Sequence, residues 1–187
     1  MSRTPIGDHA LLSDRHSSAL VTTSGSVDWL TFPRFDSPSV LGRLLGDDAG
    51  HWQVSPVGPW TSSRRYLDRT LVLETTFRTT AGTFVLTDAM ALGPDNGGHR
   101  LGTDVPHVLV RKLACSDGDV EVEIDYQPRP EYGLIVPLLH NVESGVTARG
   151  GAEWLVLTAA GLSIDGPRAH GRRTLRAGEE IYLAMHR

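Results

Sequence analysis

Apolar and polar residues alternate along much of the chain, and the dominant period is two rather than 3.6. Between Val108 and Tyr126 an apolar run is followed by a turn at 116–118 and then by a strictly alternating segment. In that segment the apolar positions are Val120, Val122, Ile124 and Tyr126, and the polar positions are Glu121, Glu123 and Asp125. The pattern predicts a β-hairpin with one buried face and one solvent-exposed face.

The same pattern predicts two earlier hairpins, so that an antiparallel sheet follows. Their turns are Ser24-Gly25-Ser26 and Thr80-Ala81-Gly82, and the flanking strands are 19–23 with 27–32 and 71–78 with 83–89. In the C-terminal third, glycines separate short apolar segments at 146–149, 153–159, 162–164 and 181–185. Short strands at this spacing are typical of a β-sandwich or barrel.

One segment, Ser37 to Gly46, has the pattern of a short helix. Ser37 is a suitable N-cap, Pro38 suits the first turn, and Gly46 can end the helix. The apolar residues between them are Val40, Leu41, Leu44 and Leu45. The predicted fold class is therefore all-β, a large antiparallel β-sandwich with one short helix.

Composition excludes several classes of protein. The chain has 187 residues, 40% of them hydrophobic, and a formal net charge of -4, which fits neither a disordered chain nor a nucleic-acid-binding domain. No stretch approaches the length of an apolar membrane span. The single cysteine, Cys115, has no partner for an intrachain disulfide and is expected to be a small buried side chain. We expect a cytoplasmic protein that binds neither nucleic acid nor a membrane.

Motifs of common catalytic sites are absent from the sequence. There is no phosphate-binding glycine loop, no HExxH, no Gly-x-Ser-x-Gly and no CxxC, and the eight histidines are scattered. The carboxylates Glu121, Glu123 and Asp125 fall on the predicted solvent face of a strand. We therefore expect no catalytic residue, no metal site and no cofactor in this chain.

The segment from Asp28 to Ser37 is the most unusual in its chemistry. It combines Asp28, Trp29, Arg34, Phe35 and Asp36 close to two prolines. Aromatic rings stack on the CH faces of sugars, and Arg and Asp bind hydroxyl groups, so these residues suit a carbohydrate. The alternative is a structural corner, in which Trp29, Phe32 and Phe35 belong to the core and Arg34 pairs with Asp36 or Asp28.

Several motifs of the chain resemble those of one known protein family. The most specific are Gly-Ser-Val-Asp-Trp at 25–29, Pro-Arg-Phe-Asp-Ser-Pro at 33–38, and the run from Tyr66 to Thr75. In this order, and over nearly the whole chain, they resemble the N-terminal domain of bacterial and archaeal glycoside hydrolases of family fifteen, the glucoamylase and trehalase-like group. The resemblance implies that residues 1–187 form a large twisted β-sandwich, sometimes called a supersandwich.

The resemblance also implies a catalytic (α/α)6 barrel downstream, which this chain lacks. Enzymes of the family hydrolyse α-glucosidic bonds with inversion, using two Glu residues of the barrel separated by roughly 6.5 to 9.5 Å. The partners implied are the protein's own barrel and an α-glucoside such as trehalose or a maltooligosaccharide. His186 and Arg187 follow directly on the last predicted strand, as expected if the polypeptide continues. Departures from the family pattern at His9, Thr31 and 89–91 leave the substrate open.

Three hypotheses follow for the function. In the first, the chain is a non-catalytic domain whose loop from Asp28 to Ser37 faces the barrel, with Trp29 and Phe35 at the active-site entrance and Arg34 and Asp36 holding the loop or contacting sugar hydroxyls. In the second, it is a free-standing carbohydrate-binding sandwich that uses exposed aromatic residues. The third is a purely structural sandwich. The aromatic residues available for the second hypothesis are Trp52, Trp60, Tyr132 and Trp154, of which Trp154 is expected in the core.

Overall fold

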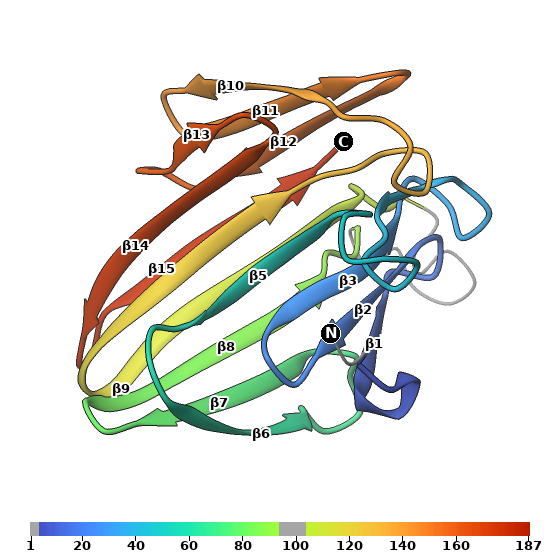
Figure 1. The fold of residues 1–187 in the computed structure, drawn as a ribbon. Helices are drawn as coiled ribbons and strands as arrows, with labels where there is room; N and C mark the ends of the chain where they lie inside the picture. Colours follow the sequence, from blue (N-terminus) through green and yellow to red (C-terminus); the bar gives the residue numbers. More distant parts are fainter. Residues whose placement is uncertain (1–3, 94–103) are drawn as a thin grey trace.

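The computed structural model describes residues 4–93 and 104–187, and these fold into a β-sandwich of 15 antiparallel strands whose two layers, called here the first and second sheet, pack face to face and are continuous through β9 (Figure 1). The first sheet contains β1 (His9–Ser13), β2 (Ser18–Thr22), β3 (Ser26–Thr31), β4 (Ser39–Leu41), β5 (His51–Pro56), the second half of β9 (Val108–Gln127), β13 (Ser163–Asp165) and β14 (Arg168–Arg176). The second contains β6 (Trp60–Tyr66), β7 (Leu73–Thr79), β8 (Gly82–Met90), the first half of β9, β10 (Leu138–Val142), β11 (Gly145–Gly150), β12 (Glu153–Thr158) and β15 (Glu180–His186). The predicted all-β fold is confirmed.

The two earlier hairpins are confirmed as the pairs β2–β3 and β7–β8, and the four short C-terminal strands as β11, β12, β13 and β15. The hairpin predicted around 116–118 is wrong in one respect. The chain does turn back there, but the two halves of β9 lie in different sheets and pair with other strands (Figure 1). Gly118 has a φ of 69°, and a Cβ on it would come within 2.0 Å of the carbonyl oxygen of Ala81, so the bend requires glycine.

The helix predicted between Ser37 and Gly46 is also wrong. Residues Ser39–Leu41 form β4, which pairs with β3, and the residues after it form turns. Val40 and Leu41 are buried, and a short apolar run fits a buried strand as well as a helix. The one helix of the described residues is a single 3-10 turn, Ile6–Asp8.

The core lies between the inner faces of the two sheets. The first sheet contributes Val27, Trp52 and Tyr126, and the second contributes Phe77, Phe84, Leu109 and Met185, among others. Phe77 and Phe84 stack with ring centroids 5.6 Å apart. Cys115 is buried, as predicted. This core leaves the outer faces and the two ends of the sandwich for interactions with other molecules.

A buried ion pair on the inner face of the second sheet is hydrogen-bonded across the core to the opposite layer. Arg111 of β9 and Asp88 of β8 both have 0% exposed side chains, and the Arg111 Nε donates to Asp88 Oδ1 over 2.8 Å. The same guanidinium donates to the carbonyl oxygens of Trp52 in β5, at 2.8 Å, and Gly25 in the β2–β3 turn, at 2.7 Å, both on the side of the first sheet. It also lies over the Trp52 ring, 4.9 Å from the centroid.

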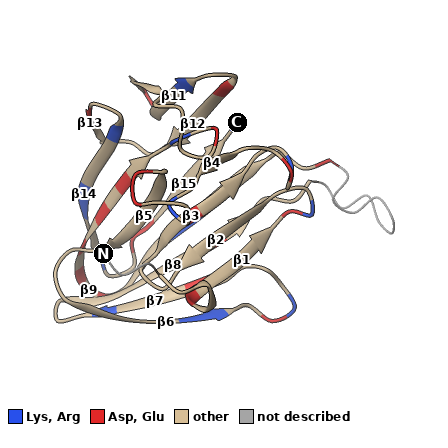
Figure 2. Ribbon diagram, turned by 45° about the vertical axis from the view of Figure 1, so that its right-hand side comes forward, with Lys and Arg blue, Asp and Glu red and all other residues tan. Residues whose placement is uncertain are grey.

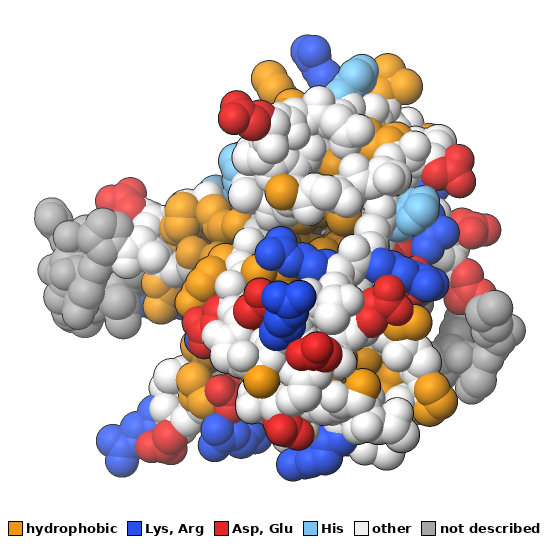
Figure 3. Space-filling model, turned by 90° about the vertical axis from the view of Figure 1, so that its left-hand side faces the viewer, with side chains coloured by type: hydrophobic (Ala, Val, Ile, Leu, Met, Phe, Trp, Pro, Cys, Tyr) orange, Lys and Arg blue, Asp and Glu red, His pale blue; other side chains and the backbone are white. Residues whose placement is uncertain are grey.

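The two ends of the sandwich differ in character. At the end where β9 bends, basic and acidic side chains lie side by side, as on an ordinary solvated surface (Figure 3). At the opposite end lie the connections 14–17, 32–38, 42–50 and 128–137, and β15 finishes there with His186 opposite Val108 (Figure 1). We call this the loop end. It contains the segment from Asp28 to Ser37.

We predict that Asp88→Ala lowers the free energy of unfolding by about 3–5 kcal/mol, because it leaves the Arg111 charge buried without its carboxylate partner. Urea unfolding at pH 7 measures the effect. Asp68→Ala is the matched control, since Asp68 forms an exposed ion pair with Arg69 and should unfold like the wild type. Equal midpoints for both variants would contradict the structural role of the pair.

Candidate functional site at the loop end

Asp28 is the extra residue of a β-bulge, and its side chain is buried. The pairing of β2 with β3 runs from Leu20 opposite Trp29 to Val21 opposite Val27, so Asp28 has no partner in the ladder. Its carboxylate accepts a short hydrogen bond from the Ser26 hydroxyl and lies 3.7 Å from His9 Nε2 and 3.9 Å from Arg43 Nη1. Asp28 therefore holds neighbouring segments together and does not face solvent.

Arg34 and Asp36 form the ion pair that sequence analysis named as the structural alternative, but the pair is exposed. Arg34 Nε donates to Asp36 Oδ1 over 2.9 Å and Nη2 to Oδ2 over 3.3 Å, and the side chains are 69% and 73% exposed. The hydrogen bond from Arg34 lowers the pKa of Asp36. Of the nearby aromatic residues only Phe32 is in the core, whereas Phe35 is exposed.

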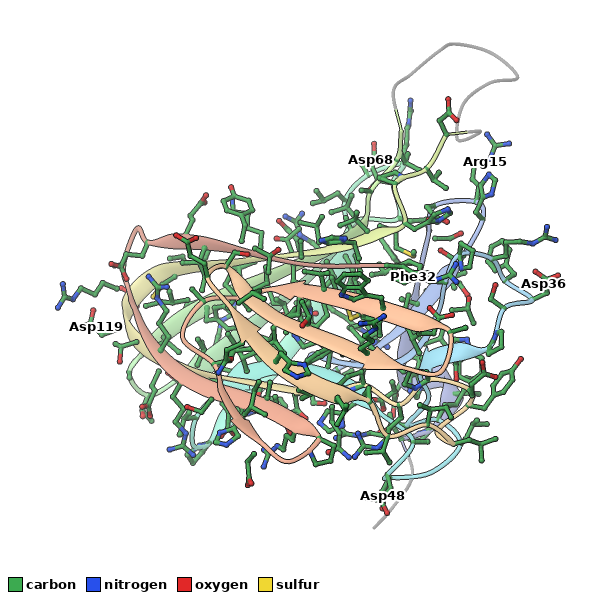
Figure 4. All side chains as sticks on the ribbon, turned by 90° about the horizontal axis from the view of Figure 1, so that it is seen from above. Arg15, Phe32, Asp36, Asp48, Asp68 and Asp119 are labelled. Atoms are coloured by element: carbon green, nitrogen blue, oxygen red, sulfur yellow. The ribbon has the colours of Figure 1, made fainter. Side chains whose placement is uncertain are left out.

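A hollow of about 400 Å³ lies beside this ion pair, lined by Arg15, His16, Arg34, Phe35 and Asp36. Figure 4 shows Arg15 and Asp36 projecting at the same end of the molecule, opposite Asp119 at the bend. Two guanidinium groups, an imidazole, a carboxylate and a phenyl ring offer hydrogen bonds and a stacking surface suited to a polyhydroxyl ligand. The geometry thus brings together three of the five predicted residues.

Arg15 and His16 were not predicted, and the turn that carries them is built around Asp14. The buried Asp14 carboxylate accepts hydrogen bonds from the backbone N–H groups of His16, at 2.9 Å, and Ser17, at 2.6 Å. This is the Asx-turn geometry that Asp favours, and it places Arg15 at a φ of 78°. An Asp followed by three polar residues between two apolar strands was the available signal, but it indicates a turn rather than a ligand.

Trp29 lies apart from the hollow, on the outer face of the first sheet. Its ring centroid is 6.3 Å from that of Tyr132, in the connection between β9 and β10. Tyr132 was considered only as a member of a separate aromatic platform. Two other candidates cannot belong to an exposed platform: Trp52 is in the core, and Trp60 is partly buried and packs against the core. Trp154, expected in the core, is instead 57% exposed.

A polar network on the outer face of the first sheet joins β5, β9 and β14. Asp125 of β9 receives hydrogen bonds from His51, at 3.0 Å, and from Arg168 of β14, at 2.6 Å. Burial raises the pKa of Asp125, but the hydrogen bonds from His51 and Arg168 outweigh it and lower the pKa from 3.8 to about 2. Figure 2 shows acidic positions along the second half of β9 and basic positions along β14.

The described part of the chain contains neither a cluster of metal ligands nor a membrane-spanning helix. Within residues 4–93 and 104–187, no group of three or more His, Cys, Asp or Glu side chains is arranged to hold a metal ion. No helix in those ranges is long and apolar enough to cross a membrane.

The fold and the site define the class of protein: an all-β sandwich domain with a polar hollow at its loop end. A family model described as "Trehalase-like, N-terminal" matches residues 1–178, and the chain belongs to this family.

Curated relatives agree with the family model. The chain is 33% identical over 206 residues to a trehalase of Mycolicibacterium smegmatis and 32% identical over 200 residues to a trehalase of Mycobacterium tuberculosis, in both cases over 97% of this chain. It is 35% identical over 131 residues to trehalase 1 of Sulfolobus acidocaldarius, covering 70% of this chain and 20% of that protein. The chain spans 30% of the length of the M. smegmatis protein and 29% of the M. tuberculosis protein.

We predict that Asp125→Asn lowers the free energy of unfolding by about 2 kcal/mol at pH 7, the value of a pKa held about two units below normal. A depressed carboxyl pKa stabilises the fold above the unfolded-state pKa, and this contribution is lost as the pH falls from about 4 through 2. Urea unfolding at pH 7 and pH 2.5 tests this prediction. The difference between variant and wild type should shrink by more than half at pH 2.5; a difference that is the same at both values would contradict it.

Proposed function

We propose that this chain is the non-catalytic N-terminal domain of a trehalase-like glycoside hydrolase of family fifteen, and that the complete protein hydrolyses an α-glucosidic bond with inversion. The observation that carries the proposal is the match over 97% of this chain to proteins named trehalase, of which it spans only 30% or less. The remaining length is room for the catalytic (α/α)6 barrel that the motifs at 25–29 and 33–38 imply. Trehalose is the substrate that we propose, because both mycobacterial relatives are named trehalase.

In this proposal the loop end faces the active-site entrance of the barrel. Phe35 and the ion pair of Arg34 with Asp36 are exposed and beside a hollow, so they can contact a substrate or the rim of the barrel without any change in the sandwich. In this proposal Asp28 and Trp29 do not contact the substrate. Asp28 holds the loop through its contact with Arg43, and Trp29 packs against Tyr132. A cytoplasmic location belongs to the same proposal and is supported by the free, buried Cys115.

We predict that Arg34→Ala and Asp36→Ala in the full-length protein each lower kcat/KM for trehalose about tenfold, the equivalent of one lost hydrogen bond to the substrate or the barrel. The melting temperature should barely change, because an exposed ion pair adds little to stability. Arg69→Ala, in the exposed pair with Asp68, is the matched control. Wild-type kcat/KM and melting temperature in both variants would overturn the role of the loop.

A free-standing carbohydrate-binding domain is the second candidate, favoured by the exposed Trp154. The guanidinium carbon of Arg149 lies over its ring, 5.4 Å from the centroid, and the side chain as a whole is 57% exposed, which leaves ring surface on which a sugar could stack. Calorimetric titration of the 187-residue chain with maltose, trehalose and maltotriose separates the two. Millimolar or tighter binding that Trp154→Ala abolishes would favour the binding domain; no heat of binding would favour the proposal above.

A further inference from the structure

Large apolar side chains gather in a second part of the loop end, away from the polar hollow. Leu45, Tyr132 and Leu134 line a separate depression of about 340 Å³, and they are 50%, 46% and 81% exposed. Trp29 lies next to Tyr132. We call these four residues the apolar rim. Single exposed apolar residues are ordinary, but several around one depression mark an interaction site.

The backbone that presents the rim is held in an unusual conformation. Glu131, Tyr132 and Gly133 have φ values of 56°, 60° and 95°, although the first two carry a Cβ. Hydrogen bonds fix this turn on both sides: Tyr132 N–H donates to the Ser39 carbonyl, and Gly133 N–H donates to the Arg129 carbonyl. Unfavourable backbone that is firmly held is concentrated at functional sites. Here it positions Tyr132 and Leu134 in solvent, where they contribute little to the fold.

The neighbouring loop that carries Leu45 is equally well anchored. Leu44 N–H donates to the Asp28 carbonyl over 3.1 Å, and the Arg43 guanidinium donates to the Ser26 hydroxyl over 3.2 Å. The two loops touch, since a Cβ on Gly133 would come within 2.8 Å of the Ala49 Cβ. The rim is therefore a rigid surface, formed before any partner binds.

Position and charge indicate what covers the rim. About 70% of the length of each mycobacterial relative lies outside the part that this chain spans. The proposed function assigns that length to a C-terminal region, and β15 ends on the loop-end side with Arg187 donating to Glu153, so such a region would begin at the same end of the sandwich as the rim (Figure 1). Asp47 and Asp48 line the same depression and are exposed. An occupant with apolar side chains flanked by Lys or Arg would match both features.

We propose that the apolar rim is the seat on which the C-terminal region of the same polypeptide docks, through an apolar patch flanked by basic residues. This inference rests on the proposed function for the existence of that region, and it separates two tasks at the loop end. The rim fixes the position of the C-terminal region, and the polar hollow beside it is left open toward the substrate.

Hydrogen exchange of the full-length protein tests the docking. In Leu134→Asp and in Leu45→Asp, peptides covering 129–137 and peptides of the facing C-terminal segment should exchange about tenfold faster than in the wild type, because a charge at the seat opens the contact. Leu71→Asp is the matched control: Leu71 is an exposed leucine in the β6–β7 connection that does not line the depression, and its variant should leave the C-terminal region unchanged. Unchanged circular dichroism at 20 °C verifies that each variant is folded.

Two results would overturn the docking proposal. In the first, exchange changes only within 129–137 and in no C-terminal peptide. In the second, the wild type is a dimer that Leu134→Asp dissociates, which would make the occupant a second copy of the chain. Neither readout depends on hydrolysis, so a protein that docks but does not cleave trehalose would refute the proposed function and leave the docking intact.

Discussion

The buried guanidinium of Arg111 is the interaction on which the rest of the sandwich depends. A charge in the core is unfavourable unless it is paired and hydrogen-bonded, and here Asp88 neutralises it while the carbonyls of Trp52 and Gly25 also accept from it, so each of the three guanidinium nitrogens has an acceptor. Since Asp88 and Arg111 belong to one sheet and the two carbonyls lie on the side of the other, the sheets are fixed in position as well as in separation. Apolar contacts alone would fix the separation less specifically.

The hydrogen bond from Arg111 to Gly25 connects the ion pair to the β2–β3 turn, and through β3 to the loop end. Gly25 accepts the Arg111 hydrogen bond at a φ of 76°, and a Cβ there would come within 2.3 Å of the Val54 carbonyl oxygen, so the turn has one possible position. β3 begins directly after it, and the bulge at Asp28 follows two residues later. Asp28 in turn contacts Arg43 and Leu44 of the loop that carries Leu45. A continuous series of contacts thus links the buried ion pair to the loop that carries Leu45.

The sequence predicted which residues are strands better than it predicted which strands are neighbours. Alternation assigns faces, and it does so correctly for Val120 to Tyr126, but a turn signal at 116–118 is compatible with a hairpin and with a bend between two sheets. In the apolar run 153–159 the phase is ambiguous, which is why Trp154 was placed in the core although Leu155 and Leu157 are the buried residues. No pattern predicted the strands β1, β5, β6, β10 and β14. In β14 the reason is that only two side chains, Ala169 and Leu175, are fully buried.

The candidate site shows the same limit, because proximity in sequence was taken as proximity in function. Asp28, Arg34 and Asp36 were grouped as one chemical unit, yet the bulge turns Asp28 into the interior while Arg34 and Asp36 remain in solvent. The residues that complete the arrangement, Arg15 and Tyr132, lie on other connections and carry no local motif. The contacts of the buried Asp28 carboxylate account for it as part of the fold. The exposed ion pair of Arg34 with Asp36 adds little stability, which is why the proposed function assigns these two side chains a contact outside the sandwich.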